Sequence, residues 1–172
     1  MLLRNFLASV LACVTLIDAS SLHAGHVSWS SELRSVLLSN RDVAVPSRGP
    51  IVLQFWASWC GGCVALSMTL DQSTKAWPGV SLLGISIDQH LADAQKGTMR
   101  FGALIPTIAL VFDNHSDWAK RFNVTSVPTV VIVDSEGQER FRSVGHLNAA
   151  DMLAIERTLA QLVSLNVDGS RP

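Results

Sequence analysis

The 172-residue sequence lacks a cluster of basic residues, and its N-terminal apolar run is too short to cross a membrane. The formal net charge is −1, from 13 Lys and Arg against 14 Asp and Glu, and neither sign forms a long run. Phosphate binding needs a clustered positive surface, so we expect no nucleic-acid partner. The apolar run covers residues 6–17, FLASVLACVTLI, whereas a spanning helix needs about 20 apolar residues.

A short apolar run near the N-terminus is typical of the central region of a secretory signal peptide. Small and polar residues follow this one, and cleavage after Ser21 or Ala24 would remove it. We therefore predict that residues 1–24 are a signal peptide and that the protein is exported to the periplasm. An uncleaved membrane anchor is the first alternative, and lipidation of Cys13 is the second.

Cysteine is scarce, with three residues in the whole chain. If the signal peptide is removed, Cys13 leaves with it and only Cys60 and Cys63 remain. A disulfide that closes so short a loop restrains the unfolded chain very little. A small secreted scaffold stabilised by disulfides carries more cysteines, spaced further apart. We therefore interpret the Cys60–Cys63 pair as chemically reactive.

The sequence has no second CxxC motif, which argues against a zinc site. Structural zinc needs four ligands, and no histidine shows ligand spacing to the cysteine pair. The five histidines are His23, His26, His90, His115 and His146. We predict no metal site, and nothing in the sequence indicates a bound cofactor.

The sequence also has no internal repeat or low-complexity segment, and its 48% apolar and 16% charged residues suit one sizeable core. Strand patterns alternate with helix patterns and end in a hairpin and a closing helix, which predicts an α/β fold with helices on both faces of one sheet. The predicted strands are 51–56, 80–87, 108–112, 129–134 and 139–144, and the predicted helices are 30–40, 64–75, 89–101, 117–122 and 148–163.

The segment Cys60-Gly61-Gly62-Cys63 stands between a predicted buried strand and a helix start. At a helix N-terminus, unpaired N–H groups and the positive end of the helix dipole stabilise an anion. A thiolate gains from this, so we expect the pKa of Cys60 to lie below that of a free cysteine. Cys63, about one turn further on, can attack a mixed disulfide formed on Cys60. This arrangement is suited to thiol–disulfide exchange.

Residues 55–63, FWASWCGGC, are similar to the active-site segment of the thioredoxin superfamily, especially its exported TlpA/ResA-like thiol–disulfide oxidoreductases. Residues 122–129, FNVTSVPT, and 133–137, VDSEG, resemble the cis-proline segment and the following hairpin of the same family. The resemblance implies a thioredoxin fold, in which a central mixed β-sheet has helices on both faces. The expected organisation is a signal peptide over 1–24, a helical extension over 25–49, the thioredoxin-like domain over 50–165 and a tail over 166–172.

The same resemblance assigns roles to individual residues. Cys60 is expected to be the attacking nucleophile and Cys63 the resolving cysteine. The peptide bond before Pro128 is expected to be cis, with the proline beside the cysteine pair. Val127 would pair with the backbone of a bound partner. From its position next to Cys60, and not from the resemblance, Trp59 is expected to form part of the docking surface.

Gln54 lies within the predicted buried strand, where an apolar residue is usual. Thioredoxins hold a buried acid at the matching position, which helps to move the proton of the second cysteine. Because Gln54 cannot titrate, proton transfer from Cys63 would need water or another group. The alternative interpretation is a partly exposed glutamine, or one hydrogen-bonded to the backbone.

Five further positions are considered for the site. Gly61 and Gly62 stand where many TlpA/ResA-like proteins carry a proline, and glycine weakens helix initiation. Trp56 is predicted to be a core residue. His146 follows Gly145 on a loop that could approach the site, but such a histidine is more often exposed, so we assign it no catalytic role. Pro106 is interpreted as an ordinary strand-entry proline.

The sequence thus predicts an exported, monomeric thiol–disulfide oxidoreductase that acts on protein thiols and disulfides. The expected direction is reduction of partner disulfides, with electrons supplied by a membrane donor. The nearest competing hypothesis is a disulfide oxidase or isomerase. A copper(I) metallochaperone of the same fold is also compatible with the cysteine pair, since thiolates bind soft metals, as is a binding module that has lost turnover.

Overall fold

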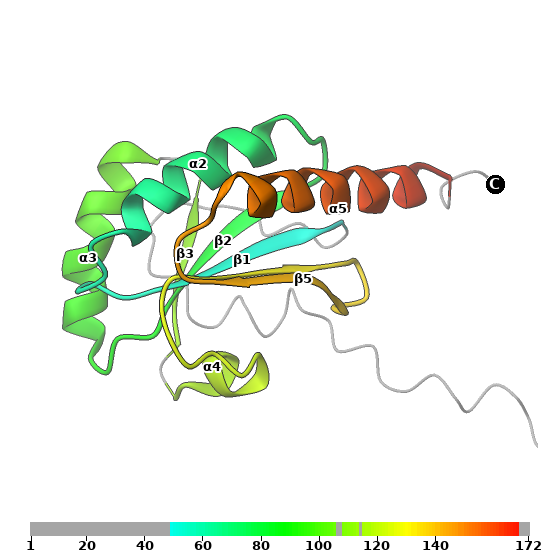
Figure 1. Cartoon of the computed structure of the whole chain (residues 1–172). Coiled ribbons are helices and arrows are strands. Elements are labelled where there is room, and N and C mark those ends of the chain that lie inside the picture. Colours follow the sequence, from blue (N-terminus) through cyan, green and yellow to red (C-terminus); the bar gives the residue numbers. More distant parts are fainter. Residues whose placement is uncertain (1–48, 106–107, 114, 169–172) are drawn as a thin grey trace, which may run out of the picture.

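The computed structural model describes residues 49–105, 108–113 and 115–168. All five predicted strands are present, as are the four helices predicted after residue 48. The expected signal peptide with Cys13, the helix over 30–40 and Pro106 lie outside the described residues. In chain order the elements are β1 (Ile51–Trp56), α2 (Cys63–Lys75), β2 (Ser81–Ser86), α3 (Leu91–Leu104), β3 (Ala109–Phe112), α4 (Asp117–Arg121), β4 (Thr129–Val133), β5 (Glu139–Val144) and α5 (Ala149–Asp168) (Figure 1).

The strands form one mixed sheet in the order β3-β2-β1-β4-β5. β1 is central and pairs in parallel with β2 and antiparallel with β4, so Phe55 lies opposite both Ile85 and Thr129. β3 continues the parallel half, and β5 completes the antiparallel hairpin with β4. The C-terminal end of β1 therefore lies next to the start of β4, which brings Trp56 close to the segment that precedes Thr129.

Alternate side chains of β1 enter two separate cores. Val52 and Trp56 join the core made with α2, α3 and α5, whereas Leu53 and Phe55 join a second core that includes Trp118 of α4. Figure 1 shows α2 and α5 on one side of the sheet and α4 on the other. Period-two alternation with both faces buried explains why β1 is almost wholly apolar. The predicted α/β fold with helices on both faces is confirmed.

Two helices, α3 and α5, differ from their predicted bounds by more than one residue. α3 begins two residues later than expected, because the Asp88 carboxylate binds Ser58 and Ser86 and His90 is extended, with φ −125° and ψ 135°. α3 also ends later, at Leu104, just before the residue that precedes Pro106, a position that disfavours helical geometry.

α5 runs to Asp168, beyond the predicted end at residue 163 and into the expected tail. No glycine or proline interrupts the sequence before Gly169, so nothing stops the helix earlier. Within the described part of the chain, no helix combines the length and apolar character needed to span a membrane.

Candidate active site

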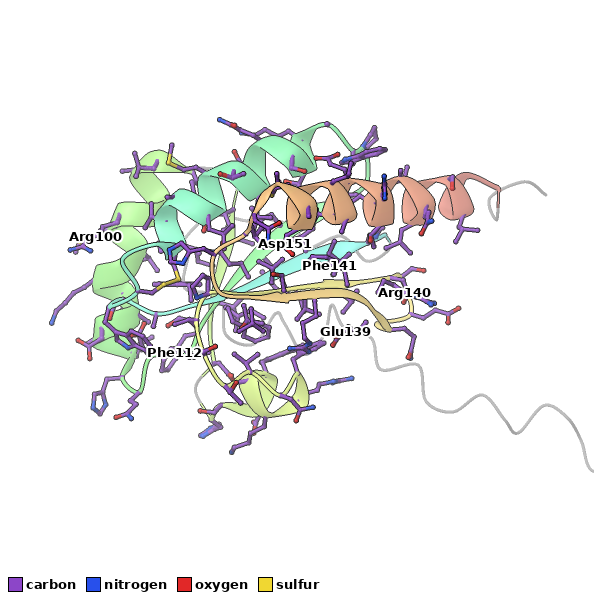
Figure 2. All side chains as sticks on the ribbon, in the orientation of Figure 1. Arg100, Phe112, Glu139, Arg140, Phe141 and Asp151 are labelled. Atoms are coloured by element: carbon purple, nitrogen blue, oxygen red, sulfur yellow. A yellow bond between two sulfur atoms is a disulfide. The ribbon has the colours of Figure 1, made fainter. Side chains whose placement is uncertain are left out.

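A disulfide joins Cys60 and Cys63 at the junction of β1 and α2, with their Cα atoms 5.5 Å apart. In Figure 2 the yellow sulfur bond lies at one end of the sheet, and the labelled Glu139 and Arg140 of the β4–β5 hairpin lie at the other. Cys60 is half-buried, whereas Cys63 has no exposed surface. One sulfur of the pair therefore belongs to the surface and the other to the core.

The turn that carries the pair leads directly into α2. The Cys60 N–H donates to the carbonyl of Ala57 at 3.0 Å, and the Leu66 N–H donates to that of Gly62 at 3.1 Å. The N-cap residue, Gly62, supplies no side-chain hydrogen bond, and the first turn of α2 holds no acidic residue. No side chain of the helix thus neutralises its positive end, which remains available to a thiolate.

Asp88 fixes the first half of this turn from the end of β2. Its carboxylate accepts the Ser58 N–H at 3.0 and 3.1 Å and the Ser58 hydroxyl at 2.8 Å. The Ser86 hydroxyl donates to the same carboxylate at 2.7 Å, and Asp88 is only 5% exposed. This buried acid holds the backbone two residues before Cys60.

Gln54 lies beneath the pair and is fully buried. Its Nε2 donates to the carbonyl of Cys63 at 2.8 Å, and its Oε1 accepts a hydrogen bond from the Ser67 hydroxyl. The Ser67 hydroxyl also lies 2.9 Å from the Cys63 carbonyl. The glutamine is therefore bonded to the backbone and not partly exposed, and the polar network behind Cys63 contains no titratable group.

The Val127–Pro128 peptide bond is cis, as the resemblance implied. Pro128 is buried and Val127 half-buried, directly before β4. The carbonyl of Pro128 accepts the N–H of Gly145 at 2.7 Å, so the segment after β5 lies beside the proline. Gly145 adopts a φ of +88°, which turns the chain there into the β5–α5 loop.

His146 reaches the cysteine turn from that loop. A Cβ atom placed on Gly62 would lie 2.8 Å from the His146 Nε2, although the histidine is exposed overall. The positive φ of Gly145 and its bond to Pro128 aim the loop back toward α2. His146 is therefore exposed, as such a histidine usually is, and its ring nevertheless lies against the cysteine turn.

The two flanking tryptophans have different surroundings. Trp56 is fully buried, as predicted, and packs against Phe101 of α3 with ring centroids 4.4 Å apart and ring planes tilted by 42°. Trp59 is 71% exposed beside Cys60, a position compatible with the docking role expected for it. Within the described ranges, no three His, Cys, Asp or Glu side chains are grouped closely enough to hold a metal ion.

Comparison with known proteins assigns the chain to a family. A family model of the thioredoxin-like domain matches residues 39–160, well over half of the chain. The chain belongs to the thioredoxin-like domain family.

Relatives of this thioredoxin-like chain include enzymes of disulfide exchange. The thiol:disulfide interchange protein DsbE of Vibrio cholerae is 27% identical over 121 residues, covering 70% of this chain and 62% of that protein. The thiol-disulfide oxidoreductase ResA of Geobacillus kaustophilus is 25% identical over 114 residues, covering 65% of this chain and 62% of that protein. Among solved structures, the exposed lipoprotein thioredoxin Etrx1 of Streptococcus pneumoniae is 26% identical with a TM-score of 0.53. The match covers 66% of this chain and 84% of that one.

The chain spans only 55–62% of the length of the DsbE proteins it matches. The thioredoxin-like family model, matched over residues 39–160, covers the pair of cysteines and the cis-proline of this chain. What the chain acts on is accordingly argued below from its own site.

Three residues of this site were not found from the sequence: Asp88, Ser58 and Ser67. Asp88 carried a usable signal, since an acid that directly follows a buried strand is costly unless it is bonded. Ser67 lies one helical turn after Cys63, the spacing at which a hydroxyl bonds the preceding carbonyl. Ser58 carried no signal of its own, because its partner is 30 residues away.

Proposed function

We propose that this thioredoxin-like protein is a thiol–disulfide oxidoreductase that exchanges disulfides with protein substrates through Cys60 and Cys63. The observation that carries the proposal is the unequal placement of the pair at the start of α2, with Cys60 half-buried and Cys63 fully buried. Only Cys60 is within reach of a partner, so the pair divides into an attacking and a resolving thiol. The names of the relatives support the same chemistry.

In the reducing direction, the Cys60 thiolate attacks one sulfur of a substrate disulfide and forms a mixed disulfide with it. The other substrate sulfur leaves as a thiolate and takes up a proton. Cys63 then loses its proton and attacks the Cys60 sulfur, which closes the Cys60–Cys63 disulfide and releases the first substrate sulfur. Two electrons pass from the pair to the substrate.

We infer that reduction is the physiological direction and that the protein works after export. The resemblance to the TlpA/ResA-like branch supports reduction, and the signal-peptide pattern of residues 1–24 supports export. A membrane donor would return the two electrons to the oxidised pair. Trp59, Val127 and Pro128 are proposed as the docking surface, since Trp59 is exposed beside Cys60 and Val127 is half-buried at the cis-proline.

The direction is tested by equilibrating the protein with glutathione redox buffers and trapping free thiols by alkylation. We expect a potential near or below about −250 mV, toward the thioredoxin end of the scale. A value near about −120 mV, typical of strong periplasmic oxidants, would contradict reduction and favour an oxidase.

The assignment of the nucleophile is tested by trapping. A Cys63→Ala variant retains Cys60 and lacks the resolving thiol, so it is expected to accumulate mixed disulfides with a disulfide-bonded test protein. The matched Cys60→Ala variant retains only the buried thiol and is expected to trap little. Equal trapping by both variants would show that burial does not separate the two roles.

A further inference from the structure

The imidazole of His146 occupies the space where residue 62 would carry its side chain. The Nε2 atom lies 2.8 Å from the position of a Gly62 Cβ, and the Cδ2 and Cε1 atoms lie 3.5 Å from it. Real Cβ atoms essentially never approach another heavy atom as closely as the Nε2 distance. A side chain from the β5–α5 loop thus lies directly over the dipeptide that separates the two cysteines.

The backbone does not require glycine at position 62. Gly62 has φ −91° and ψ −9°, and this negative φ is open to residues that carry a side chain. The neighbouring Gly61 has open space around its missing side chain. The obstacle to a side chain at position 62 is therefore His146, and glycine there makes room for the imidazole.

The rest of the network behind the pair offers no charge. Gln54 and Ser67, which surround the Cys63 carbonyl, are both neutral. The Asp88 carboxylate is committed to Ser58 and Ser86. Histidine is the side chain whose ordinary charge change falls between pH 5 and 8, and His146 brings such a group to the cysteine turn.

We propose that His146, in its protonated form, stabilises the Cys60 thiolate and so sets the reactivity of the pair, an inference that rests on the proposed function. A cation beside a cysteine lowers the pKa of the thiol. The stabilisation exists only in the reduced protein, because the disulfide carries no charge. His146 therefore favours the reduced state and makes the pair less reducing than the helix N-terminus alone would.

Charged groups on the neighbouring elements bear on this pair. On the turn, the imidazole lies against Gly62, which Cys63 directly follows and which lies two residues after Cys60. From the first turn of α5, the Asp151 carboxylate accepts the N–H of Asn148 at 2.9 Å, two residues beyond His146 (labelled in Figure 2). Asp151 thus contacts the loop that carries His146.

The first test follows thiolate absorbance against pH in the reduced protein, in a Cys13→Ser background. His146→Asn is expected to raise the midpoint of the Cys60 titration by about one pH unit, because the thiolate loses a nearby opposite charge. His146→Lys retains a cation, so the midpoint of the Cys60 titration is expected to stay low. His115→Asn, in the loop after β3 at the far edge of the sheet, is the matched control and is expected to change nothing. Unchanged titration in His146→Asn would overturn the proposal.

The second test uses Gly62→Ala, whose added Cβ displaces the imidazole. This variant is expected to raise the Cys60 titration in the wild-type background and to have no further effect in His146→Asn, because the two changes remove the same interaction. Additive effects of Gly62→Ala and His146→Asn would show that the imidazole does not act on the thiolate and would overturn the proposal.

The equilibrium with glutathione gives a third readout, which a purely structural role would not move. His146→Asn is expected to change the equilibrium constant with glutathione by up to about tenfold in favour of the oxidised pair, which corresponds to about 30 mV. Reduction of a test disulfide by the wild-type protein tests the proposed function separately. If the protein reduces no test disulfide, the Cys60 titration still measures the effect of His146.

Discussion

Gln54 places a neutral amide beneath the reactive pair, at a fully buried position of the central strand. Its Nε2 donates to the Cys63 carbonyl and its Oε1 accepts from Ser67, so both ends of the amide are bonded. A carboxylate here could accept from Ser67 but could not donate to the carbonyl. An amide thus satisfies this network, whereas an ionised acid would leave two acceptors facing each other.

We therefore expect Gln54→Glu to lower the free energy of unfolding by about 1–3 kcal/mol at neutral pH. Burial raises the pKa of the new carboxyl in the folded state. A group with a raised folded pKa contributes its stability below that pKa and loses it as pH rises. The loss should thus be smaller at pH 5, where the protonated acid can donate to the Cys63 carbonyl. Urea unfolding at both pH values measures it.

Gln161→Glu is the matched control for this change, because Gln161 is exposed in the middle of α5. Its effect on the free energy of unfolding is expected to stay within about 0.5 kcal/mol at either pH. A Gln54→Glu variant that is as stable as the control at neutral pH would show that the network rearranges to accept a charge.

Among the elements, the segment that follows β2 positions the β1–α2 turn through one side chain. Asp88 accepts hydrogen bonds from the Ser58 N–H, the Ser58 hydroxyl and the Ser86 hydroxyl, and it is almost fully buried. Asp88→Ala removes the acceptor and leaves these donors unsatisfied, so the free energy of unfolding is expected to fall by about 2–3 kcal/mol. Asp93→Ala, whose carboxylate is 45% exposed on α3, is expected to cost less than about 1 kcal/mol. Similar losses in the two variants would contradict this role for Asp88.

The packing of α3 on β1 depends on a glycine. A Cβ on Gly97 would lie 2.5 Å from Cζ3 of Trp56, a ring that is fully buried. Alanine is favoured over glycine in a helix by about 1 kcal/mol, but overpacking costs about 1–3 kcal/mol. We expect Gly97→Ala to be destabilising when measured by urea unfolding. Gly61→Ala is the control and is not expected to be destabilising, because Gly61 has open space around it. A Gly97→Ala variant more stable than the wild type would mean that the tryptophan repacks.

How far the sequence predicted this structure depends on the range of each interaction. The strands, most helix positions and the Cys60–Cys63 pair follow from local patterns, in which apolar periodicity and neighbouring residues decide the outcome. The contacts of Ser58 with Asp88 and of Gly62 with His146 join segments far apart in the chain. They depend on strand register and on the direction of the β5–α5 loop, neither of which a single sequence specifies.

At the scale of the whole molecule, the central strand connects the site to both cores. β1 leads into the turn that carries the disulfide, and its side chains enter the core under α2, α3 and α5 as well as the core that includes α4. Cys63 is itself a member of the first core. The redox state of the pair is therefore coupled to the packing of the fold and not confined to the surface.

That coupling gives a test of the redox direction that is independent of any substrate. If the folded protein favours the disulfide, as a reductant does, the linkage between oxidation and folding makes the oxidised form the more stable one. We expect the oxidised protein to unfold at higher urea concentration than the reduced protein at neutral pH. The difference should be at least about 1.4 kcal/mol, the equivalent of 30 mV for a two-electron couple. If the reduced form is the more stable one, the fold stabilises the reduced pair more than the disulfide. The protein would then act as an oxidant.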